Sequence, residues 1–411
     1  MKVIFLARRT FDNHRLIPET RQEARWLRNN KLSKVHKIML IVMPMLFITL
    51  TSVLLFVNFR ISSLAKIMHE KNNFHSSRST KIYRDKKPVN ILLLGTDTGE
   101  LGRTDRGRTD TIMIATINPK KKKILLTSIS RDTLTLIAGQ ENQGFQKLNA
   151  AYTFGGVSAS AKTISKYLNV PIDGYLLVNM KGLVESINHV GGIAVKSPLT
   201  FTFSPDTAHE TGKVIYKFTQ NSSSFSVSHN YGKTWTRKTR MNGQDALAFS
   251  RMRYQDPNGD YGRQLRQRLV IMALLQKTKD YKSLLSQSFL DSIANSMRTN
   301  YDLTNLTEIA ENYHGAIQNI SSQYLKGQNK QVDGIDYQYS TDSQKQKVTD
   351  SIRSLLGLSQ ENTGTKYGGQ DSDISSDSSS SSSSNYRNPA MATQNNSDDT
   401  DDFATQYNAN N

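Results

Sequence analysis

The stretch LAFSRMRYQDPNGDYGRQLRQRL, residues 247–269, contains five arginines and no lysine. If its backbone is extended before the first turn, Arg251 and Arg253 lie on one face, because side chains alternate along a strand. The turn at 256–259 leads into a helix for which Asp260 is the expected N-cap. If the piece around Met252 is extended, the stretch therefore brings arginines together across a turn and a helix.

Along the predicted helix, Asp260, Arg263 and Gln267 share one face, whereas Arg268 points away from it on the same helical wheel. One interpretation is a solvated basic helix with surface ion pairs, the usual fate of a charged run. The other is an anion site, because arginine supplies a planar fork for phosphate oxygens where lysine would suffice for solubility. The bias towards arginine favours a site for a diphosphate or another polyanion.

The composition of the 411-residue chain indicates an anionic partner and an exported protein. Its formal net charge is +18, which is typical of proteins that bind nucleic acid, lipid head groups or an anionic polymer. Cysteine is absent, which excludes thiolate metal sites, cysteine nucleophiles and disulfides. The length allows one large domain or two medium domains with tails.

The N-terminal part predicts a membrane anchor. Residues 1–37 are polar and basic, and residues 38–59 (IMLIVMPMLFITLTSVLLFVNF) carry no charge. At a rise of about 1.5 Å per residue this run can cross a hydrocarbon core of roughly 30 Å. A buried core helix and a signal peptide cleaved near Ser63-Leu64-Ala65 are the alternatives, but the leader and the apolar run are long for a signal peptide. The basic flank predicts a single-pass protein of the cell membrane with a cytoplasmic N-terminus, an extracellular stalk at 60–87 and an extracellular C-terminal domain.

From Pro88 the composition is that of a globular domain. Apolar runs predict strands at 89–94, 111–117 and 124–129, with a hairpin between the last two. If all three are antiparallel, one edge of the sheet gathers the charges that stand where each run stops. Those charges are Asp97, Arg108, Asp110, Arg131 and Asp132. Any one of them is also explained as a solvated loop residue, so the grouping is what indicates a site.

The remainder of the chain predicts a mixed α/β (α+β) sandwich, because helical and strand patterns alternate. Further elements are expected as helices at 158–168 and 180–190, a strand at 174–178, an elaborated loop or small β excursion at 203–240, and amphipathic helices over 281–357. The Ser/Asp/Asn-rich segment 359–411 is too polar to form a core and is predicted to be disordered.

Splitting a diphosphate requires charge neutralisation at both phosphates as the bridging oxygen leaves. Mg²⁺, or Mn²⁺ in its place, does this with one or two carboxylates and substrate oxygens as ligands, and Asp97 and Asp110 are suitable ligands. Asp260 and Asp132 are the candidates for a general base. The guanidinium groups suited to clamp phosphates belong to Arg108, Arg131, Arg251, Arg253 and Arg263.

At these residues the sequence resembles the LytR-CpsA-Psr family. The matching pieces, in chain order, are LLLGTDT, GRTDTIMI, SISRDT, KLNAAY, NGQDALAFSRMR and GDYGRQLRQ, and the resemblance covers residues 88–358 together with the N-terminal anchor. It implies Mg²⁺ ligation by Asp97 and Asp110, and a catalytic role for Asp260, Arg131 and Asp132. Around the diphosphate it implies Arg108, Arg131, Arg251, Arg253, Arg263, Gln267 and Lys147.

The resemblance also implies a fold and a function. The expected fold is an α-β-α sandwich with an apolar cleft for a prenyl chain. The expected activity is that of an extracellular phosphotransferase, which moves an anionic glycopolymer from an undecaprenyl-diphosphate carrier to peptidoglycan, with no nucleic acid as partner. The cargo would be a teichoic acid, a capsule or another wall polysaccharide. The chain departs from the plainest members in 203–240 and in its Ser-rich tail.

Two other functions are weighed against this one. A regulator or transcriptional attenuator of envelope genes would explain the basic N-terminus, but the predicted cytoplasmic part is short and lacks a helix-turn-helix pattern. A non-catalytic protein that binds wall polymer would not need the near-complete set of acidic and arginine positions. Transfer of a labelled polymer from a prenyl-diphosphate donor discriminates among the three.

Overall fold

The computed structural model describes residues 74, 76, 78–79, 81–96, 107–208, 211–277, 287–332, 334–364 and 366–368. Within these ranges no helix is both long and apolar enough to cross a bilayer. The predicted membrane span at 38–59, the metal candidate Asp97 and the tail after residue 368 lie outside the described residues.

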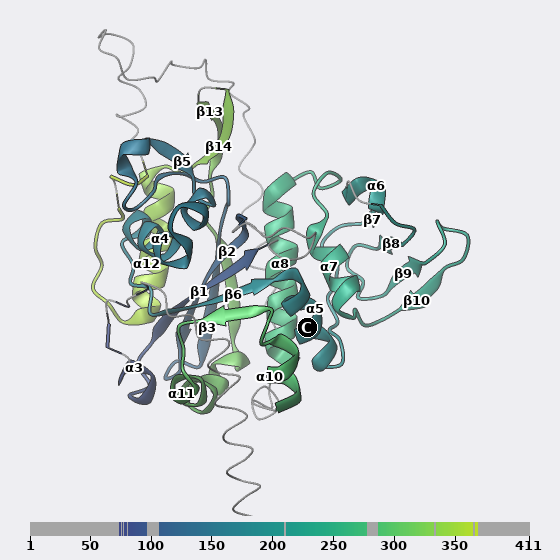
Figure 1. Cartoon of the computed structure of the whole chain (residues 1–411), viewed down its shortest axis with the longest axis horizontal. Helices are drawn as coiled ribbons and strands as arrows, with labels where there is room; N and C mark the ends of the chain where they lie inside the picture. The colour runs from purple at the N-terminus through teal and green to yellow at the C-terminus, as the bar shows by residue number, and fades with distance from the viewer. Residues whose placement is uncertain are drawn as a thin grey trace, which may run out of the picture. The chain divides into compact units, whose positions relative to one another are not determined.

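A six-stranded sheet in the order β11-β6-β1-β2-β3-β12 forms the centre of the domain (Figure 1). The predicted strands are confirmed: β2 pairs antiparallel with both β1 and β3, while β6 and β12 add in parallel to β1 and β3. β1 is apolar along its length because helices cover both of its faces. The strands are β1 (Val89–Thr96), β2 (Thr109–Asn118), β3 (Lys123–Ile129), β6 (Gly174–Asn179), β11 (Met297–Thr299) and β12 (Ile320–Tyr324).

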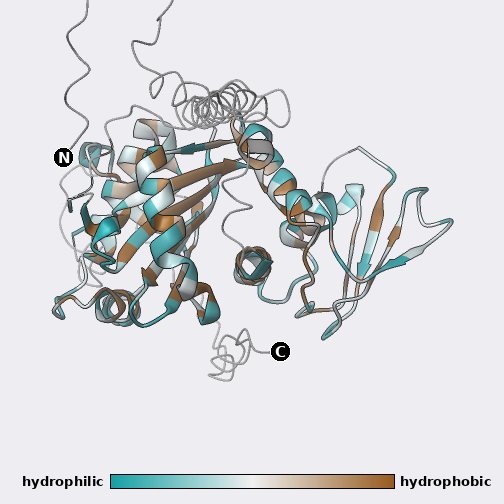
Figure 2. Ribbon diagram, turned by 90° about the horizontal axis from the view of Figure 1, so that it is seen from below, coloured by the Kyte–Doolittle hydropathy of each residue, from teal (hydrophilic) through white to brown (hydrophobic). Residues whose placement is uncertain are grey.

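Helices cover the sheet on both faces, so the predicted α-β-α arrangement is observed. On one face α4 (Ala150–Leu168) and α12 (Asp342–Leu356) pack on alternate residues of the strands, such as Leu92. On the other face α8 (Gly259–Lys277) and α11 (Leu303–Tyr313) pack on the residues between them. Figure 2 shows the apolar strands enclosed by helices whose outer sides are polar, which is the pattern expected of amphipathic helices.

The segment predicted as an elaborated loop or small β excursion is a second, four-stranded antiparallel sheet in the order β10-β9-β8-β7. Its inner face is aromatic: the Phe218 ring lies 4.7 Å from that of Phe201 and 5.2 Å from that of Phe249. These rings pack between the sheet and α7, and thereby join the small sheet to the helix that carries Arg251. The elements are α5 (Met180–His189), β7 (Phe201–Phe203), α6 (Pro205–Ala208), β8 (Ile215–Phe218), β9 (Phe225–Ser228), β10 (Thr236–Lys238) and α7 (Gly243–Arg251).

The prediction of helices throughout 281–357 is only half right. The segment contains α10 (Gln287–Ile293), α11, the short helix η2 (His314–Gln318) and α12, but also four strands. β11 and β12 complete the two edges of the central sheet, and β13 (Gln328–Val332) pairs with β14 (Ile335–Tyr339). β12 reads ISSQY, a polar sequence whose strand conformation comes from pairing with β3 rather than from its own pattern.

The packed domain extends beyond both predicted limits. Within the predicted stalk, α3 (Lys81–Arg84) buries Tyr83 in the core beneath β1, and the ring of Phe74 lies 5.4 Å from that of Tyr175. After α12, Tyr367 packs into the core with α4, and its carbonyl accepts a hydrogen bond from the backbone N–H of Leu136. Residues 358–364 and 366–368 therefore belong to the packed part of the chain.

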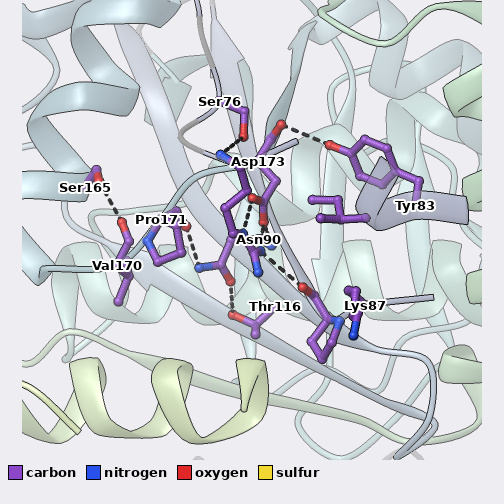
Figure 3. A network of polar contacts seen from close by, with 12 residues as sticks. Ser76, Tyr83, Lys87, Asn90, Thr116, Ser165, Val170, Pro171 and Asp173 are labelled. Atoms are coloured by element: carbon purple, nitrogen blue, oxygen red, sulfur yellow. Dashed lines mark hydrogen bonds and ion pairs between the residues drawn. The ribbon is translucent and has the colours of Figure 1, made fainter. Parts of the chain in front are cut away.

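A buried polar network fastens the incoming chain to the sheet (Figure 3). Asp173, immediately before β6, accepts hydrogen bonds from Arg78 Nε at 2.6 Å and from the backbone N–H of Asn90 at 2.7 Å. The carbonyl of Asp173 accepts a further bond from the Tyr83 hydroxyl at 2.9 Å, and Asn90 Oδ1 accepts one from Thr116 Oγ1 at 2.7 Å. The Asp173 carboxylate thus links the segment before α3 to β1 just ahead of β6, and the Asn90 side chain extends the network to β2.

Candidate active site

The arginine-rich stretch forms two helices joined by a turn. The backbone expected to be extended around Met252 is extended at Met252 itself, but Arg251 ends a helix and is not part of a strand. α7 begins with a capping box between Asn242 and Asp245, and it runs as far as Arg251. The helix stops there because Met252 has an extended backbone, with φ −54° and ψ 135°. The signal for a helix was the Asn242–Asp245 spacing, which satisfies two backbone N–H groups at once.

A buried ion pair shapes the turn between the two helices. Arg266 of α8 is fully buried, pairs with Asp256, and donates from Nε to the carbonyl of Phe249 at 3.1 Å. Its Nη2 donates to the carbonyl of Met252. Gly262 is required here, because a Cβ atom at this position would lie 1.9 Å from Asp256 Oδ2. Arg266 is therefore a structural brace, and not a ligand of the anion site.

At the predicted edge of the central sheet, the charged side chains do meet. Arg131, just after β3, donates from Nη1 to Asp110 of β2 at 2.6 Å, and its Nε lies 3.6 Å from Asp132. Asp132 also pairs with Lys147 at 2.8 Å. Lys147 ends β5 (Phe145–Lys147), which pairs with β4 (Leu134–Leu136), and η1 (Glu141–Gln143) lies between them in sequence. The antiparallel register brings these residues together, because the start of β2 lies beside the end of β3.

The first turn of α8 supplies a second set of charges that faces the first. Asp260 pairs with Arg263 and accepts a hydrogen bond from Gln264 Nε2 at 2.9 Å. Burial lowers the pKa of Arg263, the Asp260 and Asp110 carboxylates oppose that change, and the neighbouring Arg131 and Arg253 reinforce it. The α8 turn and the sheet edge therefore lie within electrostatic reach of each other.

Arg131 stands in the middle of this cluster. Burial acts to lower the pKa of its guanidinium. The carboxylates of Asp110, Asp132 and Asp260 together raise this pKa by more than burial lowers it, so the net change is upward. Nevertheless its Nε has no hydrogen-bond partner among the described residues, and the same is true of the Nε of Arg263. Buried donors of this kind are rare in native proteins, and here they point to a ligand with acceptor oxygens.

The other residues predicted to surround the diphosphate are all at least partly exposed to solvent. Arg108 is exposed and directly precedes β2, and the side chains of Arg251, Arg253 and Gln267 are half-buried. The Arg253 guanidinium lies 5.8 Å from the centre of the Tyr254 ring. Their roles around a diphosphate stay predictions.

The helical wheel pointed Arg268 away from Asp260, Arg263 and Gln267, but it did not indicate that Arg268 is buried. This side chain is buried, and it lies in line with Asp260 and Gln264 at intervals of four residues. Gln264, which sequence reasoning missed, holds the carboxylate of Asp260. The spacing of four residues from Asp260 to Gln264, and from Gln264 to Arg268, was the signal in the sequence that could have predicted this contact. The prediction instead paired Asp260 with Arg263, which is three residues away.

Of the two carboxylates predicted to hold a divalent cation, Asp110 is the one that the structure describes. Asp110 uses one carboxylate oxygen for Arg131, and the adjacent Thr109 hydroxyl is buried without a partner in the described chain. Within that part of the chain, no group of three or more His, Cys, Asp or Glu residues is arranged to hold a metal. Mg²⁺ tolerates so few protein ligands when phosphate oxygens complete its shell.

A family model described as the LytR_cpsA_psr family matches residues 54–354. The chain belongs to the LytR-CpsA-Psr family. A family member from Enterococcus faecalis, named polyisoprenyl-teichoic acid–peptidoglycan teichoic acid transferase TagU, is 37% identical over 282 residues, which are 68% of this chain and 84% of the relative. Biofilm regulatory protein A of Streptococcus mutans is 34% identical over 304 residues, covering 72% and 70%. The crystal structure of protein gbs0355 from Streptococcus agalactiae superposes with a TM-score of 0.60 at 30% identity, covering 73% of this chain and 97% of that one.

Proposed function

We propose that this protein is a glycopolymer phosphotransferase, which moves an anionic wall polymer from a polyisoprenyl-diphosphate carrier to peptidoglycan. The observation that carries the proposal is a pair of partly buried arginines, Arg131 and Arg263. Their Nε atoms are buried and have no hydrogen-bond partner among the described residues. Membership of the LytR-CpsA-Psr family and the teichoic acid transferase named among its relatives support the same function. The regulator alternative is supported by the basic N-terminus and by the names of some similar proteins, but neither accounts for the cluster of arginines and carboxylates.

In the proposed reaction, a hydroxyl oxygen of peptidoglycan attacks the phosphorus that carries the polymer. A new phosphorus–oxygen bond forms, and the bond to the bridging oxygen breaks, so that the lipid leaves as its monophosphate. The hydroxyl proton passes to a carboxylate, for which Asp260 is our candidate because Gln264 and Arg263 fix its position. Asp132 is the second candidate, held between Lys147 and Arg131.

The arginines neutralise the charge that develops on the diphosphate oxygens. Arg131 and Arg263 are partly buried, and Asp110 and Asp260 hold them in place, so little reorganisation accompanies the reaction. Mg²⁺ held by Asp110 and Asp97 would further neutralise the leaving phosphate. We also propose that residues 38–59 anchor the protein in the membrane, with the N-terminus in the cytoplasm and the catalytic domain outside.

Replacement of Arg263 by lysine tests the role of the guanidinium in this reaction. The lysine keeps a positive charge but loses the planar fork, which is worth about 1.5–3 kcal/mol in a charge-assisted pair. We expect kcat/KM for transfer from a synthetic prenyl-diphosphate donor to fall roughly ten- to a hundredfold. Arg84→Lys, at an exposed position of α3, is the matched control. Equal rates for the two variants would rule out Arg263 as a phosphate ligand.

A further inference from the structure

Two arginines on α8, two residues apart, have opposite surroundings. Arg266 and Arg268 are both buried, with 0% and 2% of their surface exposed. Arg266 has a carboxylate partner in Asp256 and donates to two backbone carbonyls. Arg268 has neither, and its Nε and Nη1 find no hydrogen-bond partner in the described part of the chain.

In the described part of the chain, the Arg268 guanidinium lies over the ring of Tyr324, whose centre is 5.6 Å away. Burial lowers the pKa of this group to about 10, so Arg268 still carries its charge at neutral pH. An aromatic face offsets only part of the cost of burying a cation, whereas a counter-charge with hydrogen bonds offsets most of it. Among the described residues, therefore, no carboxylate neutralises this buried positive charge.

Other buried polar atoms without hydrogen-bond partners in the described part of the chain belong to residues next to Tyr324 on the sheet or one turn from Arg268 on the helix. Ser128 Oγ on β3 is buried without a hydrogen-bond partner among the described residues. Ser128 stands opposite Tyr324 in the parallel β3–β12 pair, and Tyr324 is the residue under the guanidinium. Gln264, one turn before Arg268, bonds Asp260 through Nε2 while its Oε1 is buried without a partner.

These groups continue inward from the proposed active site. Arg268 follows Asp260 by two helical turns, so their Cα atoms are separated by about 12 Å along the helix axis. Long side chains on a helix lean back over its preceding turn, which brings the guanidinium closer to Asp260 than its own Cα is. Tyr324 agrees with this direction, because its ring also lies 5.1 Å from that of Tyr261 in the first turn of α8.

We propose that Arg268 and Ser128 form an inner phosphate subsite, which binds one phosphoryl group of a diphosphate while Arg131 and Arg263 bind the other. The fold keeps Arg268 without a counter-charge so that the ligand supplies it. The identity of the complete ligand rests on the proposed function, whereas the subsite itself requires only an anion with two phosphoryl groups.

The test measures binding of inorganic pyrophosphate and of inorganic phosphate to the purified full-length protein in detergent, with and without Mg²⁺. The wild type is expected to bind pyrophosphate more tightly than phosphate, since only pyrophosphate reaches both subsites. Arg268→Met is expected to weaken pyrophosphate binding about tenfold or more and to leave phosphate binding nearly unchanged. Ser128→Ala is expected to weaken pyrophosphate binding relative to phosphate binding as well, but by a smaller factor than Arg268→Met.

Thermal unfolding without ligand separates this proposal from a purely structural role. Removal of a buried charge that lacks a partner is expected to leave Tm unchanged or to raise it in Arg268→Met. Arg266→Met removes one half of a satisfied pair and is expected to lower Tm. A lower Tm for Arg268→Met with an unchanged preference for pyrophosphate would overturn the proposal. If Arg268→Met does not fold, Arg268→Gln is measured in the same way. The wild type could also prove inactive as a transferase while Arg268→Met still loses the preference for pyrophosphate. That result would refute the proposed function and support the subsite.

Discussion

Asp260→Asn is expected to reduce kcat for polymer transfer by about 10²–10⁴, the range in which a positioned general base contributes to catalysis. Asparagine has nearly the same shape as aspartate and can still accept the hydrogen bond from Gln264 Nε2. It cannot accept the proton of the attacking hydroxyl. The loss is therefore expected in kcat, with little change in the KM for the lipid donor, because the arginines that bind the diphosphate remain.

The pH profile distinguishes a base from a residue that only positions Arg263. If Asp260 is the base, the acidic limb of the kcat profile disappears in Asp260→Asn. Asp85→Asn, at an exposed position after α3, controls for the loss of one negative charge. A larger loss in Asp132→Asn than in Asp260→Asn, together with an intact acidic limb in Asp260→Asn, would assign the base to Asp132 instead.

Asp173→Ala is expected to lower the free energy of unfolding by about 3–5 kcal/mol, because it leaves the buried end of Arg78 without its partner. The side chain of Asp173 is fully buried and accepts bonds from Arg78 and from the backbone of Asn90. Its loss therefore affects both the segment before α3 and the start of β1. The measurement is urea unfolding of the purified protein, followed by circular dichroism.

Two further variants serve as controls for the unfolding measurement on Asp173→Ala. Asp350→Ala on α12 removes a half-buried carboxylate that has one glutamine contact, and is expected to change stability by no more than about 0.5 kcal/mol. Arg78→Met, in the background of Asp173→Ala, removes the cation left behind and is expected to recover part of the loss. A change below about 1 kcal/mol in Asp173→Ala would mean that this network is not a main support of the fold.

The sheet was predictable from local sequence because its strands are buried on both faces. The runs at 89–94, 111–117 and 124–129 are apolar enough to read as strands without any knowledge of their partners. The short charged hairpin at 119–122 limits two of them to antiparallel pairing. From these facts it followed that Asp110, Arg131 and Asp132 would share an edge, as the ion pairs confirm.

The two edges of the sheet were not predictable in this way. β12 carries two serines and a glutamine in five residues, and it is a strand because β3 offers it a row of backbone partners. Likewise, Arg251 ends a helix because a capping box upstream decides the conformation of the whole segment. The secondary structure of these two segments depends on residues that lie outside the short stretch in which a local sequence pattern is sought.

The family, the α-β-α arrangement and the charges that meet at the end of β3 could all be predicted from the residues and their order along the chain. The tertiary structure alone decided what each arginine of α8 is for. Arg263, Arg266 and Arg268 are the same residue type within six positions, and no local pattern separates them. One faces the open charge cluster, one is satisfied by Asp256 and two carbonyls, and one is buried with no counter-charge. The difference lies in packing against distant segments, because burial and partners, and not residue identity, set what a guanidinium contributes.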